Sequence, residues 1–278
     1  MRVLRSGERS RLIVTLAAVS VCAVGSISAQ DRPESRQGAL WTLEGLKVGQ
    51  CVRFLIDPAA AGKQLRPGTR LLRADQDTSL HQALSTVIQS QPEFSAWTPS
   101  SLCLYYADAI RVGGRRFSSK DPRRRQMLGM WAIAAIEQGG GRRDIVVVLF
   151  ATNEEFVHSA DMAKIKATEA RSRASIVAAT GNDLYDVRIG KTRLVWNGRA
   201  AGDSTRVDRP IQEPWLTRGA SGTLWRVQTT IKPAWSRSLV GVLTVEGKDD
   251  LAKALKGSPT RFVGPLYFGG GGELRFSR

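Results

Sequence analysis

The sequence has few of the side chains that enzymes and metal sites most often use. Histidine occurs twice in 278 residues, at His81 and His158, and neither lies near other metal-binding residue types at a useful spacing. The G-x-S-x-G motif that marks a nucleophilic serine is missing. The sequence therefore predicts no metal ion and no cofactor, and it favours a protein that is not an enzyme.

A glycine-rich phosphate loop is also missing. The glycines Gly139 to Gly141 stand before an apolar run, Ile145–Leu149, whereas a phosphate-binding loop follows a strand and opens a helix. This order points away from nucleotide binding. Aspartate and glutamate are plentiful, 25 in all, so a hydrolase with two catalytic carboxylates stays open as an alternative.

Long apolar runs are scarce. Residues 12–24 form one, but it is shorter than the roughly 20 residues that a membrane-spanning helix needs. Arginines precede this run and the small residues Ser26–Ala29 follow it, which is the pattern of a secretory signal peptide. We expect residues 1–29 to be that signal peptide and residues 30–39 to be a flexible lead-in. The predicted chain is exported, periplasmic or extracellular, of a bacterium, and does not span the membrane.

Cysteine occurs only three times. Cys22 falls in the predicted signal peptide, which leaves Cys51 and Cys103 in the mature chain. An even number of cysteines in an exported protein indicates a disulfide, so we expect these two to be joined.

Strand patterns dominate the rest of the chain. The stretch from Asp144 to Phe150 is apolar, β-branched and bounded by turn residues, as in a strand buried on both faces. Further short apolar runs are separated by Gly, Pro and Asp turns, which indicates antiparallel meanders. The predicted fold class is β-rich α+β, with antiparallel meander sheets and a few helices.

Three local expectations follow from turn and cap residues. Asn153 is a plausible N-cap, and helical character continues from it to about Ala178. The dipeptide Asn197–Gly198 is typical of a tight hairpin turn. Asp203–Gly222 is polar and contains two prolines, so we expect a long loop there.

The chain divides by pattern into a β-rich first half, residues 40–150, and an α+β second half, residues 151–278. Met130–Ile133 resembles Leu224–Val227 at an offset of 94 positions, and an apolar strand and a helix start follow each. The halves are therefore either two similar pseudo-repeats with a ligand groove between them or parts of one compact domain.

Basic residues outnumber acidic ones, which gives a formal net charge of +16. Residues 111–125 concentrate this excess, because Asp121 is the one acid among seven basic side chains. The seven are Arg111, Arg115, Arg116, Lys120, Arg123, Arg124 and Arg125. Such a cluster can hold phosphate, sulfate or carboxylate groups, or it can be a solvated turn.

Two tryptophans, Trp215 and Trp235, follow prolines closely and are candidates for stacking on a ligand, with packing under a loop as the alternative. Together these features predict a non-catalytic binding or envelope-associated module for an anionic ligand. The expected partner is an anionic lipid, a lipopolysaccharide or an acidic glycan rather than a nucleic acid. The alternative is a carboxylate-dependent hydrolase, for example a glycan-cleaving one, with its site between the two halves.

Overall fold

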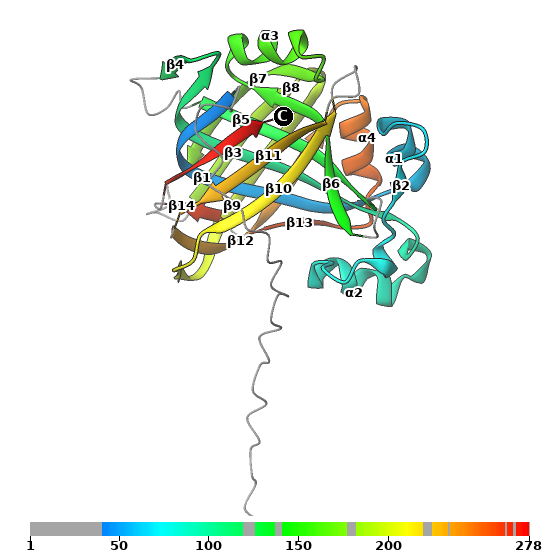
Figure 1. Ribbon diagram of the computed structural model, residues 1–278. Helices are drawn as coiled ribbons and strands as arrows, with labels where there is room; N and C mark the ends of the chain where they lie inside the picture. The colour runs from blue at the N-terminus through cyan, green and yellow to red at the C-terminus, as the bar shows by residue number, and fades with distance from the viewer. Residues whose placement is uncertain are drawn as a thin grey trace, which may run out of the picture. The chain divides into compact units, whose positions relative to one another are not determined.

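The computed structural model describes residues 41–118, 126–136, 141–176, 182–218, 224–232, 234–264, 266–268 and 271–277, all within one compact unit, Arg36–Arg278 (Figure 1). Up to Ala151 the elements are β1 (Trp41–Ile56), α1 (Pro58–Gln64), β2 (Arg70–Leu71), η2 (Ala74–Gln76), α2 (Gln82–Ser90), η3 (Pro92–Phe94), β3 (Thr98–Val112), β4 (Arg115–Ser118), β5 (Gln126–Ile136) and β6 (Arg142–Ala151). The later elements are α3 (Glu154–Met162), β7 (Ala167–Ile176), β8 (Asn182–Ile189), β9 (Thr192–Val207), β10 (Ile211–Arg218), β11 (Leu224–Ile231), β12 (Ala234–Glu246), α4 (Asp250–Gly257), β13 (Arg261–Val263), β14 (Leu266–Phe268) and β15 (Gly272–Ser277).

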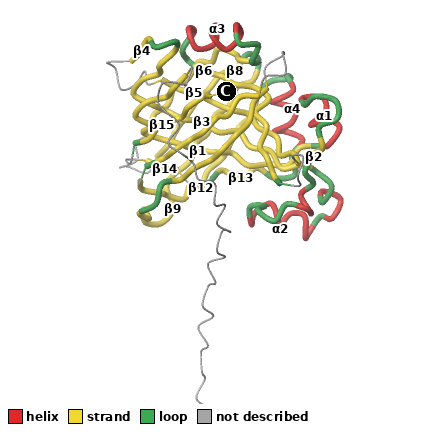
Figure 2. Tube along the Cα trace, viewed as in Figure 1, coloured by secondary structure: helices red, strands yellow, loops and turns green. Residues whose placement is uncertain are grey.

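Strands prevail and helices lie at the margins, so the predicted β-rich α+β class is confirmed (Figure 2). Most neighbouring strands are antiparallel, but β6 pairs in parallel with both β7 and β10. No helix in the described ranges is long and apolar enough to cross a membrane.

The strand pairings close into two barrels that share β1, β3, β5 and β6. In the first barrel the shared strands are completed by β10, β11 and β15. In the second barrel they are completed by β7, β8, β9, β12 and β14. Strands from both predicted halves of the sequence therefore lie interleaved in one sheet system. In a duplicated chain, β11 and β12 would correspond to β5 and β6. However, β5 pairs with β6, whereas β11 and β12 lie in different barrels. Strand pairing thus lends the proposed duplication no support.

The strands that belong to both barrels are rich in apolar residues, because each of them is buried on both faces. In β6, Val146 and Leu149 enter the core of the first barrel, while Val148 and Phe150 enter the core of the second. The apolar run at the centre of the sequence is thus a strand buried on both sides, as predicted. Trp41, Tyr105, Met130, Trp225 and Phe276 belong to the first core, and Phe54, Leu104, Trp131, Trp196 and Leu255 to the second.

The predicted helix after Asn153 is confirmed at its start and wrong at its end. The Asn153 side chain accepts the backbone N–H of Phe156, but α3 ends at Met162 and Ala167–Ile176 is strand β7. The alanine-rich sequence of β7 favours a helix on propensity alone. Pairing with β6 on one side and β8 on the other overrides that preference.

Two turn predictions are also wrong. Asn197–Gly198 lies inside the long strand β9, where a Cβ on Gly198 would sit 2.4 Å from the Trp196 indole. The glycine is needed for close packing rather than for a turn. The predicted loop Asp203–Gly222 contains the end of β9 and all of β10. Pro214 is tolerated in β10 because β6 pairs only with the neighbouring residues Leu216 and Thr217.

Candidate functional site

A bulge in β1 directs one lysine out of the regular strand. Leu46 pairs with Ala107 and Val48 pairs with Tyr106, so Lys47 is an extra residue between consecutive partners on β3. Bulges re-aim a side chain and are common beside active sites. Because Lys47 has no partner on β3, its side chain does not follow the regular alternation of the strand.

A glycine and a carboxylate complete the bulge. Gly45 has a positive φ of 68°, and a Cβ there would lie only 2.8 Å from Oδ2 of Asp108. The carboxylate therefore approaches the backbone as only glycine allows. The Lys47 ammonium lies 2.9 Å from the same oxygen, and the two side chains are 41% and 46% exposed.

The bulge borders a small pocket. Its lining residues are Leu46, Lys47, Val48, Gly49, Tyr105, Ile231, Tyr267, Phe268 and Gly271. The enclosed space is enough for about one water molecule. Gly49 leaves room for the Tyr105 ring, since a Cβ there would lie 3.2 Å from it. The floor is apolar and Lys47 is the charged group on the rim.

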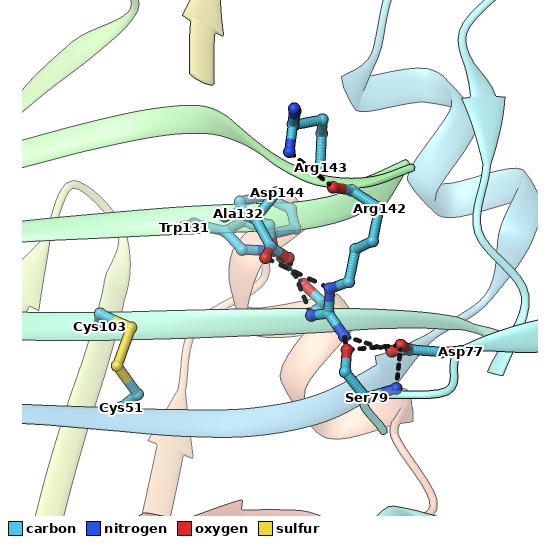
Figure 3. Close-up of polar contacts among 10 residues, drawn as sticks. Cys51, Asp77, Ser79, Cys103, Trp131, Ala132, Arg142, Arg143 and Asp144 are labelled. Atoms are coloured by element: carbon cyan, nitrogen blue, oxygen red, sulfur yellow. Dashed lines mark hydrogen bonds and ion pairs between the residues drawn. A yellow bond between two sulfur atoms is a disulfide. The ribbon is translucent and has the colours of Figure 1, made fainter. Parts of the chain in front are cut away.

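The predicted disulfide is present. Cys51 and Cys103 are register partners on β1 and β3 and are bonded to each other (Figure 3). Cys103 is fully buried in the first core, and Cys51 packs against that core. The bond therefore ties β1 to β3 two residues from Gly49 and Tyr105 of the pocket. A disulfide is typical of oxidising compartments.

The basic stretch 111–125 is described only in part. Arg111 and Arg116 both donate to the Glu44 carboxylate, at 2.9 and 3.0 Å. Burial opposes ionisation of Glu44, but the two guanidiniums outweigh it and lower the pKa of this carboxyl. The guanidinium of Arg115 lies over the Phe117 ring, 5.1 Å from its centre. Lys120, Arg123, Arg124 and Arg125 lie outside the described residues, and anion binding by this cluster stays a prediction.

The two candidate stacking residues differ in exposure. Trp215 is 7% exposed and packs in the first core, so it has no ring face for a ligand, and its assignment to a loop was wrong. Trp235 is also in a strand, β12, but is 44% exposed. Stacking on a ligand stays a prediction for Trp235 alone.

Two carboxylates, Asp77 and Asp144, are held by one guanidinium, that of Arg142. Arg142 donates to Asp144, at 3.0 Å from Nη2, and to Asp77 and the Ser79 hydroxyl from Nη1 (Figure 3). Burial works against the charge of Arg142, yet the two carboxylates outweigh it and raise the pKa of the guanidinium. The cluster joins the segment before α2 to the start of β6, and it offers a substrate no open carboxylate pair.

Within the described ranges, no group of three His, Cys, Asp or Glu side chains could hold a metal ion. Lys47 was missed among the residues predicted from the sequence. Its signal was the pair Gly45 and Gly49 in an otherwise strand-like stretch, because isolated glycines in a strand indicate a bulge or a close approach.

No family model and no curated protein matches the chain. Solved structures with a similar fold include an acetoacetate decarboxylase from Legionella pneumophila (9% identity, TM-score 0.48, covering 94% of this chain and 96% of that one). An acetoacetate decarboxylase-like enzyme from Sphingomonas wittichii RW1 (10%, 0.44, 86% and 91%) and the enduracididine biosynthesis enzyme MppR (12%, 0.42, 85% and 84%) are also similar. These similar chains are enzymes, which corrects the prediction of a non-catalytic module. At these identities and TM-scores the likeness extends to no substrate and no residue.

Proposed function

We propose that this protein is an exported hydrolase that acts on a small carboxylate-bearing substrate at the Lys47 pocket. The observation that carries the proposal is the β1 bulge, which brings the Lys47 amine to the pocket rim and within 2.9 Å of Asp108. As in the alternative predicted from the sequence, the hydrolase uses a carboxylate for catalysis. The location changes from a groove between two halves to the pocket beside the β1 bulge, and its small size favours a small substrate over a glycan chain.

Lys47 is suited to hold the carboxylate of the substrate. Its ion pair with Asp108 is largely solvated, and such pairs contribute at most about 1 kcal/mol, so a substrate carboxylate can exchange with Asp108. Apolar side chains of Leu46, Ile231 and Phe268 line the same pocket. The enclosed space holds about one water molecule, so these side chains would contact a small group at the mouth of the pocket rather than enclose a substrate.

Asp108 is suited to act as the general base. Once a substrate carboxylate engages Lys47, the Asp108 oxygen nearest the amine is free to accept a proton from water. Its position is fixed by the close approach to Gly45. A water activated there could attack an ester or amide carbonyl held at the rim.

Export is supported by the signal-peptide pattern of residues 1–29 and by the Cys51–Cys103 disulfide. Intact-mass measurement of the protein secreted by a bacterial host tests this part. A mature chain that begins at Gln30 is expected, and an uncleaved chain confined to the cytoplasm would contradict export.

The enzymatic part is tested with a matched pair of chromogenic short-chain esters, one with a free carboxylate and one with that group methylated. We expect Asp108→Asn to lower kcat by about a hundredfold or more on both esters, as loss of a general base does. Lys47→Met is expected to raise KM for the acidic ester alone. The controls Asp161→Asn and Lys63→Met remove exposed charges from α3 and α1. Hydrolysis unaffected by Asp108→Asn, or no hydrolysis of either ester, would rule the proposal out.

A further inference from the structure

Three arginines lie in one row across the second barrel. Arg171 on β7 is opposite Arg188 on β8, and Arg188 is in turn opposite Arg193 on β9. The ribbons of β7 and β8 lie side by side next to α3 (Figure 1). Directly opposed residues have Cβ atoms about 4.5–5.5 Å apart, and like charges in that position destabilise a sheet. The fold itself therefore does not favour this row of arginines.

Strand alternation directs the arginines away from the barrel interior. Val187 and Ile189, on either side of Arg188, are buried in the second core. Ala170, beside Arg171, belongs to the same core. The Arg171 side chain is 87% exposed, and Arg188 is also exposed. A ligand in solution can therefore reach both guanidiniums.

The neighbouring acids compensate the three arginines unequally. Arg193 donates to both oxygens of Asp186, at 2.9 and 2.8 Å. Arg171 lies 4.0 Å from Glu169, at the limit of an ion pair. Arg188 makes no ion pair with any other described residue. The two adjacent arginines on β7 and β8 are thus left with most of their charge uncompensated.

We propose that Arg171 and Arg188 together bind a phosphate monoester group, at a site separate from the Lys47 pocket. A guanidinium is a planar fork that holds an oxyanion through two parallel hydrogen bonds. A phosphate monoester has three acceptor oxygens and a charge of about −1.5 to −2 near pH 7, so it can accept from both forks and balance both charges. A carboxylate has two oxygens and a single charge, which one fork is enough to satisfy.

The surrounding sequence adds positive potential to the site. Residues 164–199 carry eight basic and three acidic side chains, a net charge of +5. These residues span β7, β8 and the start of β9, so strand pairing gathers charges that are separated in the sequence. A positive field raises the local concentration of anions, and it attracts a doubly charged ligand more strongly than a singly charged one.

Isothermal titration calorimetry with phenyl phosphate and phenyl sulfate tests the site, because the two esters are alike in shape and differ in charge. We expect phenyl phosphate to bind more tightly than phenyl sulfate. Arg171→Gln and Arg188→Gln should each weaken the binding of phenyl phosphate about tenfold, since each removes one fork.

Two control variants belong to the same titration. Arg199→Gln removes an exposed arginine from the same side of β9, six residues and about 20 Å from Arg193. At about 0.1 M salt the screening length is about 10 Å, so this variant should bind phenyl phosphate almost as the unaltered chain does. Lys47→Met should also bind it unchanged, which keeps the result independent of the Lys47 pocket.

Urea unfolding gives a second readout. Because Arg188→Gln removes a like charge from the middle of the row, we expect its midpoint without ligand to equal or exceed that of the unaltered chain. Phenyl phosphate should raise the midpoint of the unaltered chain and leave that of Arg188→Gln almost unchanged. A lower midpoint for Arg188→Gln without ligand, together with unchanged binding, would show that the row serves the fold and would overturn the proposal.

The source of the phosphate is distinguished by titrations with glycerol 3-phosphate and with vesicles that contain phosphatidic acid. Binding of either one that Arg188→Gln weakens supports the site and identifies a free or a lipid-borne phosphate. Equal binding of phenyl phosphate and phenyl sulfate, equal weakening by Arg199→Gln, or no binding of any of these phosphates would overturn the proposal.

Discussion

Two ionic clusters stand in opposite environments. At Arg142 a guanidinium is held between Asp77, whose side chain is 2% exposed, and Asp144. At Lys47 a lysine and Asp108 share one contact of 2.9 Å with both side chains more than 40% exposed. Sequence alone makes them look alike, since each is an ordinary pairing of a basic residue with aspartate.

Burial separates their roles. Removal of one partner from a buried pair leaves a charge without compensation and strongly destabilises the fold, whereas an exposed pair contributes little. A cluster that the fold depends on is poorly suited to exchange partners with a substrate. The Lys47–Asp108 pair can do so at low cost, and Lys47 lines a pocket.

The largest effect is expected from Arg142→Met. This change leaves Asp77 buried with only the N–H and hydroxyl of Ser79 as donors, and we expect it to lower the free energy of unfolding by about 3–5 kcal/mol. Urea unfolding followed by circular dichroism gives the value. Lys47→Met is the matched control, because it also replaces a cation with a methionine, and it should cost less than about 1 kcal/mol. Similar losses in the two variants would remove the distinction between the clusters.

A somewhat smaller effect is expected from loss of the disulfide. Cys51 and Cys103 are 52 positions apart, and closing a loop of that size stabilises the fold by about 4 kcal/mol in the chain-entropy model, with less commonly observed. We expect Cys51→Ala/Cys103→Ala to unfold at lower urea concentration while the Arg142 cluster stays intact. Because the bond lies beside Gly49 and Tyr105, the double variant should also lose any ester hydrolysis at Lys47 before it unfolds. Full activity up to the unfolding transition would separate the disulfide from the pocket.

Much of the fold could be predicted because it depends on local pattern. The buried run in β6 and the cap at Asn153 each carry their signal within a few residues, and the disulfide follows from the number of cysteines in an exported chain. Long-range pairing accounts for the errors. Ala167–Ile176 is a strand only because β6 and β8 lie on either side of it, and sequence cannot show that β6 borders two barrels.

The candidate site was missed for a related reason. The bulge at Lys47 exists only relative to β3, since it is defined by Leu46 and Val48 facing consecutive residues of the partner strand. The basic run 111–125 was conspicuous because its charges are adjacent in sequence, yet Arg111 and Arg116 are taken up by Glu44, from a distant part of the chain. Density of charge along the sequence is therefore a poor guide to which charges are available to a ligand.

The smallest predicted effect is a pH dependence on the Arg142 side of the comparison. His81 caps α2, which follows the Asp77–Ser79 segment, and its Nδ1 accepts the N–H of Ala83 at 3.2 Å. Only neutral imidazole can accept there, and burial, with a lesser contribution from Arg53, lowers the pKa of His81. Because the folded pKa lies below the unfolded value of about 6.5, the cap contributes fully above that pH, and its contribution is lost as pH falls below it.

The expected loss is less than about 1 kcal/mol between roughly pH 6.5 and 5, because the ring is only partly buried and a single cap is involved. Urea unfolding of the unaltered chain and of His81→Asn at both pH values measures it. Asparagine keeps a capping oxygen but does not titrate, so the difference between the two proteins should grow as pH falls, and all other residues are the same in both. A difference that does not change with pH would show that His81 does not titrate in the cap, and it would contradict this prediction.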